Sequence, residues 1–144
     1  MRRSFGALAL VTTLTPAALW AGDMPGRHFI ENWDLNGDGA VTLEELVERR
    51  GDVFAAFDAN DDGRLDAEDY ATFDEARAND MADNAGAGGK GEGRVQKGMT
   101  LAFNDIDGDG VVTREEFLSR AAAWMAMIDR NGDGRITPAD FGRK

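Results

Sequence analysis

The chain has 144 residues, with 27 Asp and Glu against 16 Lys and Arg, and it contains no cysteine. This acidic balance excludes the basic surface that nucleic-acid binding requires, and the lack of thiols excludes disulfides and cysteine-bound zinc. A hydrophobic fraction of 42% is sufficient for a folded core once the acids are neutralised, so we do not expect a disordered chain.

The first residues form a segment of their own. Arg2 and Arg3 precede an apolar run with no acid until Asp23, which predicts a secretory signal peptide over residues 1–21. A membrane-spanning helix is the alternative, but it needs about 20 apolar residues, and threonines and Pro16 interrupt the run. We therefore expect bacterial export, to the periplasm or outside the cell, with no stable membrane span after cleavage.

Short apolar faces precede a series of acidic segments. Phe29, Ile30 and Trp33 lie five, four and one residues before Asp34, a helical spacing that predicts buried positions. The same positions before two later acidic segments hold Val53, Phe54 and Phe57, and Trp124, Met125 and Ile128. A further acidic segment departs from this pattern, because it follows Thr100, Leu101 and Asn104. We expect its incoming helix to be short or irregular, with Phe103 turned elsewhere.

Four segments of twelve residues share one acidic pattern, an aspartate at positions 1 and 5, glycine at 6, an apolar residue at 8 and an acid at 12. They are loop one, "DLNGDGAVTLEE" (34–45); loop two, "DANDDGRLDAED" (58–69); loop three, "DIDGDGVVTREE" (105–116); and loop four, "DRNGDGRITPAD" (129–140). This pattern resembles the calcium-binding loop of the EF-hand family. The resemblance implies an all-α fold of helix-loop-helix repeats, with short β-bridges between loops at position 8.

The loop pattern suits calcium chemically. Calcium takes about six to eight oxygen ligands, and glycine at position 6 allows the sharp turn that brings them together. The acids at such close spacing repel one another unless a cation lies among them. We predict up to four Ca²⁺ ions, held by side chains at positions 1, 3, 5, 9 and 12 and by the backbone carbonyl at position 7. These residues are Asp34, Asn36, Asp38, Ala40, Thr42 and Glu45; Asp58, Asn60, Asp62, Arg64, Asp66 and Asp69; Asp105, Asp107, Asp109, Val111, Thr113 and Glu116; and Asp129, Asn131, Asp133, Arg135, Thr137 and Asp140.

The loops differ at their last residue. Glu45 and Glu116 end loops one and three, whereas the shorter Asp69 and Asp140 end loops two and four. Six-coordinate geometry suits magnesium, so we expect weaker calcium sites, or partial Mg²⁺ binding, in loops two and four. Position 9 also has the residue types of a helix N-cap, and Pro138 falls at a first helical position. Little chain follows loop four, so its exit helix is expected to fray.

Only twelve residues separate the loops within each half of the chain. The helical spacing of the apolar residues predicts one helix over 114–128, shared by loops three and four, and a counterpart over 43–57, which Gly51 could break. Fifteen helical residues span about 22 Å, so the two loops of one half cannot reach each other. We predict that loop one pairs with loop four and loop two with loop three.

A glycine-rich segment, residues 78–98, lies between the loop pairs. Its composition predicts a flexible linker between one half over 24–77 and a second half over 99–144. Such a linker would let the two halves close on each other.

No residue set indicates catalysis. His28 is the only histidine and is interpreted as a boundary residue, so we expect a protein that is not an enzyme. We expect the protein to bind calcium and to act as an exported buffer or sensor. The alternative is a calcium-stabilised interaction module, similar to dockerins or to target-binding adaptors, whose protein target the sequence does not identify. Methionines that could line a target groove, or simply fill the core, are Met81, Met99, Met125 and Met127.

Overall fold

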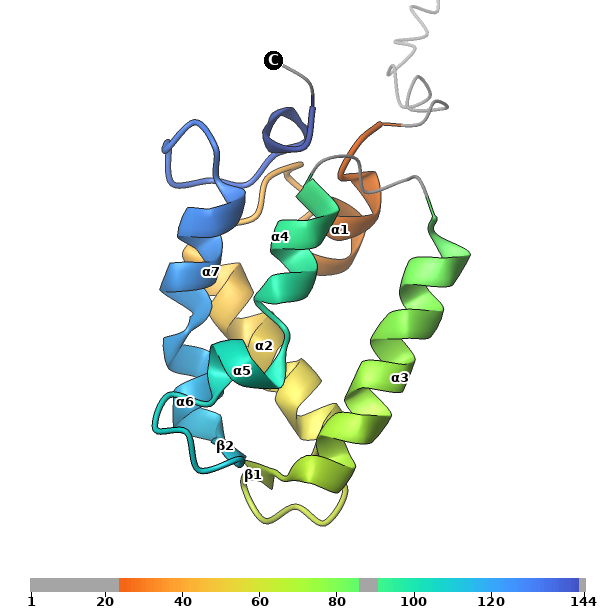
Figure 1. Cartoon of the computed structure of the whole chain (residues 1–144). Coiled ribbons are helices and arrows are strands. Elements are labelled where there is room, and N and C mark those ends of the chain that lie inside the picture. Colours follow the sequence, from red (N-terminus) through yellow and green to blue (C-terminus); the bar gives the residue numbers. More distant parts are fainter. Residues whose placement is uncertain (1–23, 86–90, 143–144) are drawn as a thin grey trace, which may run out of the picture.

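The computed structural model describes residues 24–85 and 91–142, so the predicted signal peptide, 1–21, lies outside the described residues. The elements in chain order are α1 (Arg27–Trp33), α2 (Leu43–Phe57), β1 (Arg64–Leu65), α3 (Ala67–Asp83), α4 (Glu92–Lys97), α5 (Leu101–Asn104), β2 (Val112–Thr113), α6 (Arg114–Ser119), α7 (Ala121–Ile128) and the 3-10 helix η2 (Pro138–Asp140). The predicted all-α class is confirmed (Figure 1). No helix in the described part of the chain is long and apolar enough to cross a membrane.

One hydrophobic core joins both halves of the chain. Phe29, Ile30 and Trp33 on α1 are buried as predicted, and so is Trp124 on α7. The rings of Trp33 and Trp124 lie 4.7 Å apart, edge to face, a favourable geometry for aromatic pairs. The two halves therefore bury their apolar faces against each other rather than forming separate cores.

The loops pair across the halves, as predicted. Leu65 in β1 pairs antiparallel with Val112 in β2, which joins loop two to loop three. Val41 and Ile136 form an isolated bridge with N···O distances of 2.8 and 2.9 Å, which joins loop one to loop four. Figure 1 shows the two loop pairs at opposite ends of the molecule, with α2 running between them. The length of α2 keeps its two loops apart and so determines this pairing.

Helix α2 runs unbroken through Gly51, so the suspected break is absent. A Cβ at Gly51 would lie 3.0 Å from Nη2 of Arg114, the first residue of α6. The glycine therefore serves close packing between α2 and α6. Their contact places Phe54 and Phe117 with ring centroids 5.8 Å apart.

The predicted continuous helix over 114–128 is wrong, because the chain turns at Arg120 between α6 and α7. Arg120 has ψ −6°, outside regular helix geometry. The Ser119 hydroxyl donates to the Glu116 carbonyl at 2.9 Å, which competes with the helical hydrogen-bond ladder. The Arg120 side chain is held outside the helix, where Nε donates to the Phe103 carbonyl at 2.6 Å.

The predicted linker over 78–98 is wrong at both ends. Helix α3 continues to Asp83 and α4 begins at Glu92, while residues 86–90 lie outside the described part. A Cβ at Gly98 would lie only 1.8 Å from the Trp124 ring, and the indole Nε1 donates to the Val95 carbonyl at 3.1 Å. Glycine at this position permits close packing and does not indicate a flexible chain.

The irregular segment before loop three has a partner inside the core. Helix α5 is short, as predicted, and Asn104 at its end is fully buried. Its side-chain oxygen accepts a hydrogen bond from Nη2 of Arg50, whose guanidinium is also fully buried. Arg50 further donates from Nε to the Phe117 carbonyl at 2.8 Å and from Nη1 to the Gly98 carbonyl at 3.2 Å. This arginine of α2 thus links the first half of the chain to three segments of the second.

The exit helix of loop four is a single short turn, and the residue after it packs on the core. The short helix η2 has 3-10 geometry, with Pro138 at its start as predicted. Phe141 follows it and is 1% exposed, with its ring 5.6 Å from that of Phe29. Burial of this one ring anchors the end of the described chain.

Candidate metal centre

The first aspartate of each loop organises the backbone around it. In loop one, Asp34 accepts hydrogen bonds from the amides of Gly37 at 2.7 Å and Gly39 at 2.8 Å. The same position 6 amide binds the first aspartate in the other loops, at 2.8 to 2.9 Å: Gly63 to Asp58, Gly110 to Asp105 and Gly134 to Asp129. The four loops therefore curl around their first carboxylate in the same way.

Side chains at positions 3 and 5 turn into the same loops. The Asn36 oxygen accepts from the Asp38 amide at 2.8 Å, and Asp38 Oδ1 accepts from the Ala40 amide at 3.0 Å. Equivalent contacts recur in the other three loops, at Asn60 and Asp62, Asp107 and Asp109, and Asn131 and Asp133. The predicted side-chain ligands are thus gathered within each loop, on one short stretch of curled backbone.

The final glutamate closes loops one and three. Glu45 Oε1 accepts from the amides of Leu35 at 3.0 Å and Asn36 at 3.1 Å, while Oε2 accepts from the Thr42 amide at 2.8 Å. Thr42 in turn caps α2 by accepting from the Glu45 amide. Thr113 and Glu116 form the same reciprocal pair at α6. The predicted N-caps are therefore present, and each glutamate spans the start and end of its loop.

The final aspartates differ from each other. Asp140 accepts from the backbone amide at loop position 2 at 2.9 Å and from the Thr137 amide at 2.8 Å. The matching contacts of Asp69 are longer, 3.5 and 3.2 Å. Loop four ends in the tighter 3-10 helix, which brings its short side chain inward, whereas α3 keeps α-helical geometry. Loop two is the less tightly closed of the two loops that end in aspartate.

Loop two also carries backbone strain. Its position 4 is Asp61 with φ +57°, where the other loops place Gly37, Gly108 and Gly132 at φ of 71° to 75°. The left-handed region is unfavourable for residues with a Cβ. Loop two thus combines a short final acid, which loop four shares, with a left-handed aspartate at a position where the other loops have glycine.

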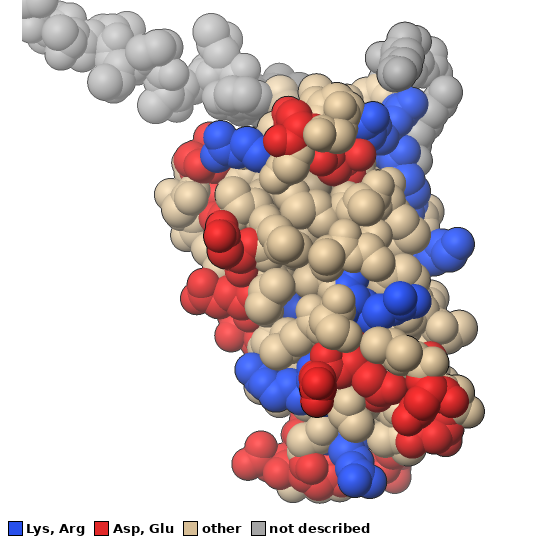
Figure 2. Space-filling view, turned by 90° about the vertical axis from the view of Figure 1, so that its left-hand side faces the viewer, with Lys and Arg blue, Asp and Glu red and all other residues tan. Residues whose placement is uncertain are grey.

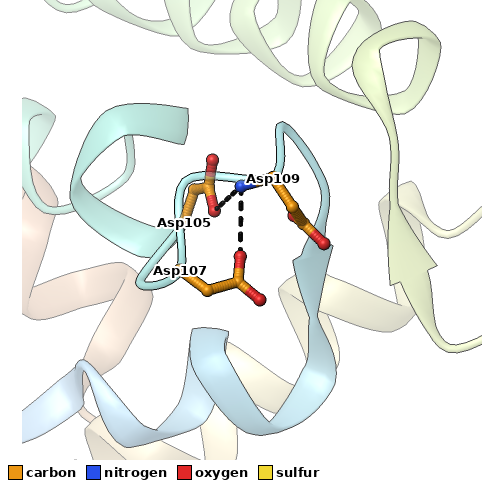
Figure 3. A group of neighbouring side chains, drawn as sticks. All are labelled: Asp105, Asp107 and Asp109. Carbon is orange, nitrogen blue, oxygen red and sulfur yellow. Dashed lines mark hydrogen bonds between the residues drawn. The ribbon is translucent and has the colours of Figure 1, made fainter.

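Loop three brings three carboxylates close together. Oxygens of Asp105, Asp107 and Asp109 lie within 4.8 Å of one another. Figure 3 shows Asp105 and Asp107 both directed at the Asp109 amide, at 3.2 and 3.1 Å. In the described part of the chain, these three carboxylates form no ion pair with a basic residue. Hard oxygens gathered without a cation partner fit a divalent cation such as calcium.

The charges in loop three perturb one another. Backbone hydrogen bonds lower the pKa of Asp105, and the bond from the Gly110 amide has the largest effect. Hydrogen bonds also lower the pKa of Glu116, and the bond from the Thr113 amide has the largest effect. For Asp107, the bond from the Asp109 amide acts to lower the pKa, but partial desolvation and repulsion from Asp109 and Glu116 outweigh it and raise the pKa. A bound cation would relieve this repulsion.

The acidic residues are distributed unevenly over the surface. Figure 2 shows acidic side chains gathered toward the lower end, where loops two and three lie, with others near the top and along the left edge, and basic side chains at mid-height.

Two side-chain contacts, one between loops and one between helices, have no signal in the sequence pattern. Arg135 of loop four reaches Asp38 of loop one with its guanidinium at 2.9 Å. His28 lies at the boundary, as interpreted, and its Nε2 is 3.0 Å from Asp80 on α3. Both contacts join residues far apart in sequence, so only the tertiary structure reveals them.

The repeats match a known family. The profile described as "EF hand" matches residues 31–48, 51–74, 102–119 and 121–143, more than half of the chain. With the loop geometry and the paired loops, this match shows that the chain belongs to the EF-hand family of calcium-binding proteins.

Relatives of this chain carry matching names. It is 29% identical to "Probable calcium-binding protein CML28" of Oryza sativa subsp. japonica, over 80% of this chain and 88% of the relative. It is 31% identical to "Probable calcium-binding protein CML17" of the same plant, over 81% of this chain and 64% of the relative. It is also 23% identical to "Calcium-binding protein LPS1-alpha" of Lytechinus pictus, over 80% of this chain and 53% of the relative.

Proposed function

We propose that this protein is an exported calcium buffer that binds up to four calcium ions in loops one to four. The carrying observation is that both loop pairs cap a single core that Arg50 ties together across the halves. A sensor would have to open an apolar groove, and opening here would separate a buried guanidinium from its partners at a large energetic cost. A compact protein that binds without opening is a buffer.

The methionines support the same proposal. Met99 and Met125 are buried in the core, and Met127 packs against it, whereas Met81 is 42% exposed on α3. Methionine-rich grooves serve sensors that recognise varied targets. Here the buried methionines already have partners within the protein, which favours the core interpretation over a target-binding groove.

Export is part of the proposal and is supported by the basic and apolar start of the chain, residues 1–21. Expression of the full chain in a bacterium, followed by cell fractionation and N-terminal sequencing, tests export. Recovery of only the uncleaved chain from the cytoplasm would contradict it.

Calcium binding is tested by calorimetry with and without magnesium, alongside tryptophan fluorescence and binding of a hydrophobic dye. We expect up to four calcium ions, competition by magnesium confined to loops two and four, and no rise in dye signal with calcium. A rise in dye signal would indicate a sensor or target-binding adaptor instead.

Matched variants locate the sites. Glu45→Gln and Glu116→Gln remove the final acids of loops one and three and should each abolish the corresponding calcium site. Glu44→Gln and Glu115→Gln make the same charge change one residue earlier and should leave stoichiometry unchanged. Equal losses in both pairs of variants would show that charge alone, and not the loop geometry, attracts calcium.

A further inference from the structure

A side chain of loop four enters the electrostatic environment of loop one. Nη2 of Arg135 lies 2.9 Å from Oδ2 of Asp38, and the side chains are 51% and 41% exposed. Arg135 occupies position 7 of its loop, where only the backbone carbonyl is a predicted ligand. Asp38 occupies position 5 of loop one and is itself a predicted ligand through its side chain.

The loop pairing brings these two residues together. Val41 and Ile136 bridge antiparallel, with mutual N···O distances of 2.8 and 2.9 Å, and Arg135 directly precedes Ile136. Its side chain therefore starts next to the partner loop and needs no rearrangement to reach Asp38. The contact is a consequence of the pairing of loop one with loop four.

Both oxygens of Asp38 are engaged as a result. Oδ1 accepts from the Ala40 amide at 3.0 Å, and Oδ2 faces the Arg135 guanidinium. In loop three the corresponding acid is Asp109, whose Oδ1 likewise accepts a hydrogen bond from the Val111 amide at 2.8 Å. Among the described residues, however, no basic side chain pairs with Asp109.

The equivalent arginine in the other loop pair shows that the contact does not follow from residue type alone. Arg64 holds position 7 of loop two, and its register opposite Thr113 in loop three corresponds to that of Arg135 opposite loop one. Within the part of the chain that the structure describes, Arg64 forms no ion pair with an acid. The two loop pairs are therefore electrostatically unequal.

We propose that Arg135 is an internal cation that lowers the calcium affinity of loop one. This inference depends on the proposed calcium binding. Loop one has three acids at its ligand positions, Asp34, Asp38 and Glu45, and the guanidinium reduces their net charge from −3 to −2. A fixed positive charge beside the site also repels the incoming divalent ion. Because exposed ion pairs contribute little to folding, the effect of Arg135 falls on metal affinity rather than on stability.

The test uses Arg135→Gln in the full chain, with calcium titrations followed by the amide resonances of the loop glycines. Gly39 and Gly110 donate to the first aspartates of loops one and three at 2.8 and 2.9 Å, so each resonance reports its own loop. We expect the calcium dissociation constant of loop one to fall by about threefold to tenfold. The constant of loop three should change less than about twofold.

Control variants separate local charge from other effects. Arg49→Gln makes the same net charge change on α2, where Arg49 pairs with Asp52 at 3.6 Å, and should leave loop one within about twofold of the wild type. Arg135→Lys keeps the positive charge and should restore most of the wild-type affinity. The gap between wild type and Arg135→Gln should also shrink as salt is raised, because the charges are exposed.

The outcomes distinguish the inference from the proposed function. If no glycine resonance moves with calcium, the proposed calcium binding itself fails. If Gly39 moves with calcium but with the same dissociation constant in the wild type and Arg135→Gln, only the role of Arg135 is overturned. A weaker loop one in Arg135→Gln would likewise overturn it, because Arg135 would then support the site.

Discussion

Arg50 offers a sharp test of how the two halves are held together. Replacing it with alanine, Arg50→Ala, removes a donor from the carbonyls of Gly98 and Phe117 and from the side-chain oxygen of Asn104. The Gly98 carbonyl still accepts from Asn104 Nδ2 at 3.1 Å. The guanidinium also lies 4.0 Å from the centroid of the Phe117 ring, so its loss empties space in the core. Burial lowers the pKa of Arg50 to about 10, which shows that the charge itself is unfavourably desolvated.

The magnitude follows from these opposing contributions. Each buried acceptor that loses its partner costs about 1–3 kcal/mol, and truncation of a large buried side chain adds a cavity cost. Removal of the desolvated charge offsets part of the total. We expect a net loss of about 3–5 kcal/mol in the free energy of unfolding, a large share of the stability of a domain of this size.

Urea denaturation, with chelator and again with saturating calcium, measures this loss. Arg49→Ala is the matched control, because the neighbouring Arg49 side chain is 40% exposed and its loss should cost less than about 0.5 kcal/mol. A cycle with Asn104→Ala should give a coupling of about 1 kcal/mol or more with Arg50→Ala. If the free energies of unfolding of Arg50→Ala and Arg49→Ala differ by less than about 0.5 kcal/mol, the linking role of Arg50 is refuted.

Three further predictions concern local features. Burial raises the pKa of the single tyrosine, Tyr70, to about 12, so tyrosinate absorbance should appear near pH 12 in the native protein. Because the folded state holds the phenol proton more tightly, the associated stability should be full below pH 10 and lost as the pH rises toward 12. Ionisation of Tyr70 near pH 10 in the native protein would contradict its burial. Asp61→Gly should stabilise the protein by about 0.5–1 kcal/mol, because it removes a Cβ from a residue in the left-handed region, and the reciprocal Gly37→Asp should destabilise it by a similar amount. Thermal melting in chelator measures both changes, and melting-temperature shifts of the same sign would count against backbone strain at Asp61. Gly98→Ala should cost about 1–3 kcal/mol, because its Cβ would overlap the neighbouring indole. Gly93→Ala, within helix α4 that Gly98 follows, should be neutral or stabilising, because a Cβ there meets nothing within 4 Å. Equal urea midpoints for the two variants would argue against close packing at Gly98.

Much of the binding apparatus could be predicted from the sequence because its signals are local. Acids at alternate positions, glycine at position 6 and the cap residue at position 9 all act within twelve residues. All four loops adopt the expected turn, and loops one, two and three form the expected side-chain cap. The cross-pairing of the loops also followed from sequence, because the short spacing between loops one and two allows only one helix, α2, whose length separates its two ends. Loops three and four stay apart as well, although the segment between them divides into α6 and α7. The ligand assignment itself stays a prediction until metal binding is measured.

The tertiary structure decided the features that depend on distant partners. Glycines at 91 and 98 suggested a flexible linker, but the rings of Phe141 and Trp124 lie against them, and composition alone does not distinguish a mobile glycine from a closely packed one. The turn at Arg120 and the pairing of Arg135 with Asp38 likewise depend on which segments the fold brings together. The loop conformation depends on residues within a few positions of one another, so short sequence patterns predict it. The tertiary contacts join residues 17 to 97 positions apart, so they form only when the whole core assembles.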